Sequence, residues 1–187
     1  TWVNKTFVKA SISAINGAKV SSADVLASNG VIHVIDNVIL PPAATGTPTL
    51  NIVEVALSDP DFSTLVTALT EADLVTALSD ESKMFTVFAP TNAAFDKIPA
   101  DTLDALIADI DALTNVLLTH VVSDASLSSL DAYAANGKKL TTTSGTDISV
   151  MVDADTGMLM IGGANVIIKD IYTTNGVIHV IDTVILD

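Results

Sequence analysis

Apolar residues recur at helical spacing through the middle of the chain and give way to strand-like patterns towards its end. Apolar side chains placed three and four positions apart predict amphipathic helices. These stretches are 52–56, 62–69, 74–78, 103–110 and 113–117. A short apolar run, Met84–Ala89, predicts a buried strand, and from Lys138 onward alternating residues predict further strands. Helices in the first part and strands in the second favour an α+β fold.

Local signals mark where several of these elements begin. Asp59 followed by Pro60 is typical of a helix start, because Asp caps the free backbone N–H groups and Pro suits the first helical position. Thr91 is expected to cap the turn at 92–96, with Phe95 pointing inward.

One twelve-residue segment occurs twice. Asn29–Leu40 and Asn175–Leu186 lie 146 positions apart and differ only in Asn37 against Thr183. Each begins with the turn signal Asn-Gly and continues as a run rich in Val and Ile, which is typical of a strand buried on both faces. A period of this length predicts tandem modules, since solenoid repeats are only ~20–50 residues long.

The repeat sets the expected domain organisation. Matching residues fall within the first 41 and the last 41 positions of the chain. We therefore expect residues 1–42 to be the C-terminal part of one module and residues 50–187 to be a complete second one. The Pro-, Gly- and Thr-rich stretch 43–49 is the expected linker. The apolar strand expected at Val31–Leu40 needs a neighbouring strand, because an exposed apolar edge aggregates.

Charge and composition narrow the classes of function. The chain has 22 acidic and 8 basic residues, a net charge of −14, so nucleic acids and anionic membrane surfaces are poor partners. Its apolar runs are far shorter than the ~18 residues of a spanning helix, and no membrane insertion is expected. Cysteine is absent, which excludes disulfides, thiolate metal sites and cysteine nucleophiles.

Candidate chemistry is sparse, so we expect neither an enzyme nor a cofactor or metal. The sequence lacks a Gly-x-Ser-x-Gly elbow, a phosphate loop and a His-Glu-x-x-His motif. His33 and His179 occupy equivalent positions of the repeated strand, which favours hydrogen-bonded core histidines over metal ligands. His120 ends a predicted helix, where it could interact with the helix dipole. Asp153–Gly157 faintly resembles the start of a calcium loop but lacks its later acidic ligands, which favours a plain turn.

Two stretches resemble the signature segments of the fasciclin (FAS1) domain family. They are Thr86–Phe95, which reads TVFAPTNAAF, and Asn175–Leu186. The resemblance covers residues 50–187 and, for the back end of a module, residues 1–42. It implies a FAS1 fold, a wedge-shaped β-sandwich of short strands with a helical layer contributed mainly by the first half of the module. The core signature residues that it implies are Thr86, Phe88, Pro90, Thr91, Phe95, Asn175, Gly176, His179 and Asp182.

The resemblance also indicates two short motifs that are tied to receptor binding in animal members. The first is a Tyr-His pair at the end of the central helix, which reads Thr119-His120 here. The second corresponds to Lys169, Asp170 and Ile171, with flanking residues that depart from the family pattern. Integrin binding is therefore not carried over to this chain.

The resemblance implies a non-enzymatic extracellular adhesion or assembly module, secreted or anchored at the cell surface. Its expected partners are other proteins or further copies of the chain, joined head to tail or by strand complementation into a filament. One alternative is a protein that binds a small apolar, carotenoid-like ligand in a groove between helices and sheet. Another is a structural spacer in a surface stalk.

Overall fold

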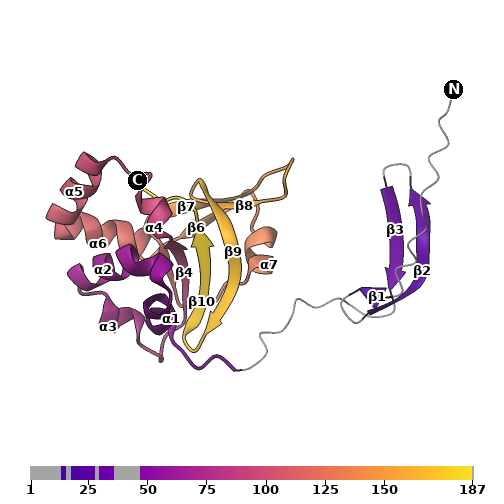
Figure 1. The fold of residues 1–187 in the computed structure, drawn as a ribbon, viewed down its shortest axis with the longest axis horizontal. Coiled ribbons are helices and arrows are strands. Elements are labelled where there is room, and N and C mark those ends of the chain that lie inside the picture. Colours follow the sequence, from indigo (N-terminus) through magenta and orange to yellow (C-terminus); the bar gives the residue numbers. More distant parts are fainter. Residues whose placement is uncertain (1–13, 16–17, 28–29, 36–46, 187) are drawn as a thin grey trace. The chain divides into compact units, whose positions relative to one another are not determined.

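The chain folds as two compact units, Thr1–Gly46 and Thr47–Asp187. The computed structural model describes residues 14–15, 18–27, 30–35 and 47–186 (Figure 1). The Asn16-Gly17 turn, the last residues of the predicted strand Val31–Leu40 and most of the predicted linker lie outside the described residues.

The helices that the apolar spacing predicted are present in the second unit. They are α1 (Ile52–Ser58), the 3-10 turn η1 (Pro60–Phe62), α2 (Ser63–Glu71), α3 (Val75–Leu78), α4 (Asn92–Phe95), α5 (Ala100–Ala108) and α6 (Ile110–Thr119). Side chains cap three of these starts, as Asn51 does in a capping box with Glu54. Asp59 accepts a hydrogen bond from the backbone of Asp61, with Pro60 at the first position, as predicted. Thr91 precedes α4, but its side chain makes no capping hydrogen bond, so that expectation was wrong.

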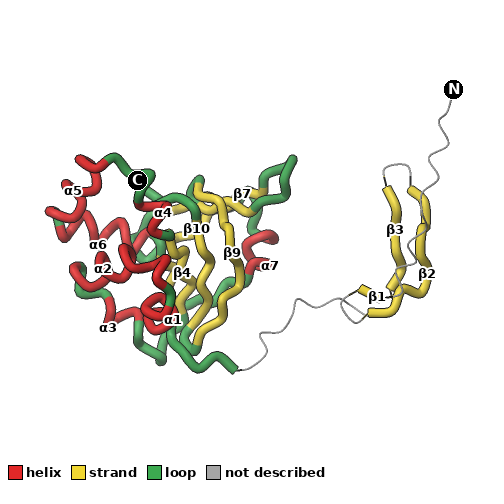
Figure 2. The backbone as a smooth tube through the Cα atoms, in the orientation of Figure 1, coloured by secondary structure: helices red, strands yellow, loops and turns green. Residues whose placement is uncertain are grey.

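Seven strands of the second unit pair into one sheet in the order β5-β4-β10-β9-β8-β7-β6. Their bounds are β4 (Phe85–Pro90), β5 (Val121–Ser123), β6 (Lys139–Thr141), β7 (Asp147–Val152), β8 (Leu159–Ile161), β9 (Ala164–Thr173) and β10 (Gly176–Ile181). The central pair, β4 and β10, is parallel, and the other pairs are antiparallel. A seventh helix, α7 (Ser129–Ala134), lies on the side of the sheet away from α1–α6 (Figures 1 and 2).

Two apolar cores lie on opposite faces of the central strands. Ile178 and Val180 of β10 pack into the first core, which also takes the buried residues of α1, α2, α4 and α6. Ile181 and Phe88 pack into the second core together with residues of β7, β8 and α7. All six residues of β10 are buried, as the sequence predicted. The sheet with its helical layer confirms the expected α+β fold.

The first unit contains a three-stranded antiparallel sheet that repeats part of the second. Its strands are β1 (Ala14–Ile15), β2 (Ala18–Ala27) and β3 (Gly30–Ile35). Each residue pair of this sheet has its counterpart 146 positions later among β8, β9 and β10. Both register shifts of the β2–β3 hairpin recur at equivalent positions in the β9–β10 hairpin. The side chain of His33 lies outside the described part of the chain.

The sequence misplaced the end of the repeated strand and missed one short helix, whereas the strand expected after His120 is present as β5. The expected strand Val177–Leu186 ends at Ile181. The carboxylate of the next residue, Asp182, accepts hydrogen bonds from the backbone N–H and the side-chain amide of Asn165. Val184 and Ile185 remain buried, although they are not in a strand. The missed helix, α7, spans only six residues, too few to show an apolar period.

We expect Gly176→Ala to abolish folding of the second unit or to cost at least about 4 kcal/mol in the free energy of unfolding. An added Cβ would lie 1.9 Å from the carbonyl oxygen of Phe85 on the paired strand. Gly163→Ala is the matched control, since Gly163 also has a positive φ but no atom within 4 Å of the added Cβ. It should cost about 1 kcal/mol. Urea unfolding measures both, and equal losses would contradict the close-packing argument.

Candidate functional site

Thr119 and His120, which the sequence placed in a binding motif, are buried at the end of α6. The Thr119 hydroxyl contacts the carbonyl oxygen of Asn115 and the Ser144 hydroxyl. Nε2 of His120 lies 2.9 Å from the backbone nitrogen of Ile185 and accepts its hydrogen. Nδ1 must then donate to the carbonyl oxygen of Val116, 2.7 Å away, so the imidazole is neutral. It holds the C-terminal segment against α6 and does not act as a cation at the helix end.

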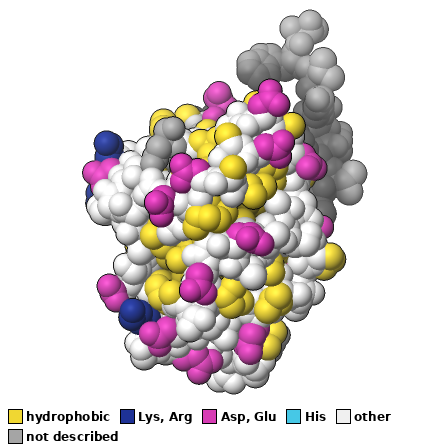
Figure 3. Space-filling model, turned by 90° about the vertical axis from the view of Figure 1, so that its left-hand side faces the viewer, with side chains coloured by type: hydrophobic (Ala, Val, Ile, Leu, Met, Phe, Trp, Pro, Cys, Tyr) yellow, Lys and Arg dark blue, Asp and Glu magenta, His cyan; other side chains and the backbone are white. Residues whose placement is uncertain are grey.

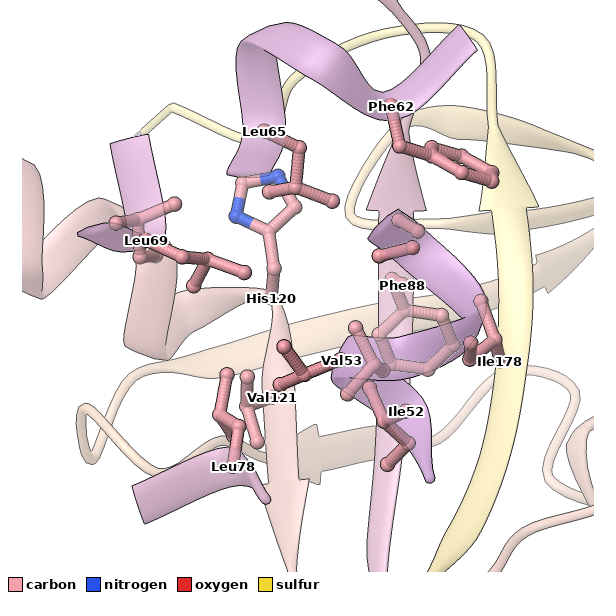
Figure 4. Close-up of a pocket in the computed structure, with 14 residues that line it drawn as sticks. Ile52, Val53, Phe62, Leu65, Leu69, Leu78, Phe88, His120, Val121 and Ile178 are labelled. Carbon is pink, nitrogen blue, oxygen red and sulfur yellow. The ribbon is translucent and has the colours of Figure 1, made fainter. Parts of the chain in front are cut away.

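His120 also borders a small closed cavity in the first core. Figure 4 shows its ring beside Leu65 and Leu69 of α2. The cavity has a volume of about 20 Å³ and is otherwise lined by apolar residues. A space of this size holds at most one water-sized molecule. This cavity is too small to hold a carotenoid-sized ligand.

Lys169, Asp170 and Ile171 lie at a bulge of β9, opposite His179. The bulge gives Asp170 a φ of 61°. The Asp170 carboxylate accepts hydrogen bonds from the backbone and the hydroxyl of Ser129, which anchors the start of α7. Lys169 is exposed, donates to the Tyr133 hydroxyl at 2.8 Å and lies over the Tyr133 ring. Ile171 packs partly against the first core. The motif thus combines one surface cation with two anchored neighbours.

His179 is a buried, neutral histidine at the centre of the sheet. Its Nε2–H donates to the carbonyl oxygen of Leu127 at 2.8 Å, and its Nδ1 accepts from the backbone N–H of Asp170 at 3.3 Å. The ring stacks on Phe88, with centroids 5.9 Å apart. Burial lowers the pKa of His179 below its ordinary value of 6.5, and this effect outweighs the hydrogen bond to Leu127.

The polar signature residues bond backbone groups that lie outside regular pairing. Asn175 accepts from the N–H of Ile52 at the start of α1 and donates to the carbonyl of Leu78 at the end of α3. The Thr86 hydroxyl bridges the segment that precedes α7, donating to the Ala125 carbonyl and accepting from the N–H of Leu127. These side chains connect the sheet to helices and loops, which is a structural role.

The other signature residues complete the frame around β4 and β10. Phe88 belongs to the second core and Phe95 to the first. Pro90 ends β4, and the carbonyl oxygen of Thr91 accepts hydrogen bonds from α4. Asp182 also forms an ion pair with Lys97, 3.3 Å away. Burial raises the pKa of Asp182, but hydrogen bonds from Asn165, Thr183 and Lys97 hold it below its usual range.

An open groove lies on the helical side of the unit, where the sequence indicated no site. It has a volume of about 320 Å³. Phe95, Leu103, Ile107 and Leu113 supply its apolar lining, and Ser63, Thr64, Thr67, Ala68 and Glu71 of α2 form the opposite wall. Figure 3 shows apolar side chains gathered on this side of the molecule, with acidic side chains around them. The apolar spacing of α5 indicates that one face of this helix is apolar. It does not tell whether that face is buried or exposed, so the groove could not be identified from the sequence.

The described residues offer little for metal chemistry. Among them, no group of three His, Asp or Glu side chains could hold a metal ion. Asp153 forms a turn in which its carboxylate accepts hydrogen bonds from Asp155 and Thr156, so its oxygen is already engaged. None of the helices in the described ranges is long and apolar enough to cross a bilayer.

We predict that the second unit loses stability as the pH falls from about 7 to about 5. His179 takes up a proton in the unfolded chain near pH 6.5 but resists it when folded, so acid favours the unfolded state in this window. Aspartates with lowered pKa values, such as Asp131 and Asp182, lose their contribution only below about pH 4.

His179→Gln, which keeps a donor for the Leu127 carbonyl, should lower stability at pH 7 by about 1–3 kcal/mol. It should also flatten the pH dependence between 5 and 7, because it removes the titrating group. Urea unfolding at several pH values measures both effects. A variant with the slope of the unaltered chain would show that another group titrates.

Comparisons with known proteins place these features in a family. The model of the fasciclin domain matches residues 3–41 and 60–187. The chain resembles a solved FAS1 domain pair from the insect cell adhesion molecule fasciclin I, with a TM-score of 0.65 and 26% identity. That match covers 91% of this chain and 60% of the insect chain.

Two relatives extend the comparison to proteins of pig and of a bacterium. Transforming growth factor-beta-induced protein ig-h3 of Sus scrofa is 38% identical over 176 residues, which are 94% of this chain and 24% of the relative. The chain thus spans about a quarter of that protein. The cell surface glycolipoprotein MPB83 of Mycobacterium bovis is 32% identical over 171 residues, 88% of this chain and 73% of the relative. This chain belongs to the fasciclin domain family.

Proposed function

We propose that the chain is a non-enzymatic adhesion or assembly module of an extracellular or cell-surface protein. Its family includes proteins of cell adhesion and of the cell surface, which supports a general adhesion role. The repeated hairpin carries the proposal further, because one chain contains the same sheet register twice. Such repetition is typical of proteins that bind through several similar modules.

The proposed organisation is a partial module, residues 1–42, joined by a linker at 43–49 to a complete module, residues 50–187. In the second unit, β10 lies between β9 and β4. β3 matches β10 in all six residues, GVIHVI, and lies last in the order β1-β2-β3 of the described strands. A strand like β4 would complete this sheet. We propose that another copy of the chain supplies it.

Of the residues in the two binding motifs that the family resemblance suggests, Lys169 is best placed to contact a partner. Thr119 and His120 are buried, so they would influence a partner only through the shape of the helix end. Lys169 is exposed and lies over Tyr133, beside the anchored Asp170. We propose this part of β9 as a contact for protein partners.

If copies complement each other through β3, the mass measured by size-exclusion chromatography with light scattering should grow with concentration. Ile32→Asp should return the chain to a monomer, because its counterpart Ile178 is buried against β4 in the complete sheet. Leu57→Asp, at an exposed site on α1, is the control and should leave the assembly intact. A monomer at every concentration would refute complementation. Failure of chain-coated beads to bind cells or other chain-coated beads would refute adhesion.

A second candidate function, binding of a small apolar ligand, is favoured by the groove beside α5. Its volume of about 320 Å³ falls at the lower end of the ~300–1,000 Å³ usual for ligand pockets. Native mass spectrometry of protein purified from its source should then show a bound adduct. Ile107→Asp should release the adduct, since it places a charge in the groove wall. An adduct-free spectrum would count against this function.

A further inference from the structure

Helix α5 carries an apolar stripe that the fold covers only in part. Leu103, Leu106 and Ile107 recur at helical spacing, which normally marks the face that packs into a core. Leu103 and Leu106 are half-buried against the first core. Yet none of the nine residues of α5 is buried, and Ile107 is 47% exposed. The same spacing in α2 and α6 buries leucines in the first core. The apolar stripe of α5 therefore contributes less to folding than its pattern predicts.

The stripe lines one wall of a groove whose two walls are both helices. Leu103 and Ile107 lie one turn apart on one wall, and α2 forms the other wall, with Phe95 and Leu113 buried at the base. α2 and α5 have nine residues each, so each is about 13 Å long. Two helical turns of a partner, with apolar anchors at positions i, i+3 or i+4 and i+7, span about 10 Å.

The charges around the groove favour a partner with a positive charge. Residues 51–119, which contain both walls, carry 12 carboxylates and only two lysines. Lys97 already pairs with Asp182. Glu71 lines the groove itself, and Asp101 and Asp104 are exposed on α5. An acidic partner, including a second copy of this unit, would be repelled, whereas a basic one would be attracted over about a Debye length.

We propose that this groove docks a basic amphipathic helix of a protein partner. Apolar side chains of that helix would fill the space between Ile107 and α2, and its lysines or arginines would face the surrounding carboxylates. This arrangement combines an apolar anchor with a charged rim, as protein interfaces commonly do. The inference rests on the proposed binding function and specifies the surface and the chemistry of the partner.

The test titrates the full chain into a labelled helical peptide of about 14 residues, or roughly four turns, built from leucine on one face and lysine on the other. Fluorescence anisotropy should show saturable binding that weakens as salt is raised. The same peptide with glutamate in place of lysine should not bind. Ile107→Ser should weaken binding of the lysine peptide about ten-fold, the effect of losing roughly one buried apolar side chain.

Leu130→Ser is the matched control, because Leu130 is 64% exposed on α7, away from the groove. It should leave binding unchanged. Equal losses in the two variants, or equal affinity for the two peptides, would overturn the inference. So would a chain that binds a neutral apolar dye at Ile107 but no peptide, or a dimer that only Ile107→Ser dissociates. A chain that adheres to cells but ignores the lysine peptide would refute this inference and leave the proposed function standing.

Discussion

The parallel pairing of β4 with β10 is the contact on which the complete unit depends. β10 is buried along its whole length and supplies side chains alternately to the two cores. A strand in this position cannot face water on either side, so its sequence is apolar throughout. The approach of Gly176 to Phe85 leaves no space for a side chain, and the next five pairs follow in register up to Pro90. The helical layer and the outer strands are built on this pair.

Polar side chains between the sheet and the segments packed against it supply hydrogen bonds to buried backbone groups. Loops and helix ends that pack against the sheet bring backbone groups away from water, and each such group needs a partner. His179, His120, Asn175 and Thr86 provide these partners for segments far away in the sequence. Within the described ranges, no buried side-chain nitrogen or oxygen lacks a hydrogen-bond partner. Each of the two described histidines accepts a hydrogen bond at one ring nitrogen. Burial lowers the pKa of His179, so acid should weaken its part of the frame before it affects the carboxylates.

The fold could be predicted from the sequence where one residue pattern had one physical meaning. The helical spacing around Phe62 and the repeated apolar strand each gave the correct element, because burial enforces the period. The end of β10 could not be predicted, since Val184 and Ile185 are as apolar as the strand and are also buried. The next residue, Asp182, bonds Asn165 through its carboxylate, a contact that only the folded chain brings about.

The candidate site was harder to predict because periodicity says that a face is apolar but not what covers it. The stripes of α5 and α6 read alike in the sequence, yet Leu113 is buried and Ile107 is not. The deciding fact is how α5 and α6 pack in the folded unit, which is a tertiary property. The surroundings of His120 could not be predicted either, because the C-terminal segment that encloses it is distant in the sequence.

The two hairpins of this chain show which positions the frame constrains. β3 and β10 are identical, whereas the partner strands β2 and β9 share their register but little of their sequence. Ile167 and Ile168, both about half exposed, correspond to Ser21 and Ser22 in β2. One hairpin geometry thus accepts either apolar or polar residues at these sites, so folding does not require the exposed isoleucines. Binding differences between modules would therefore arise on such outward positions, as on α5, while the central strand stays the same.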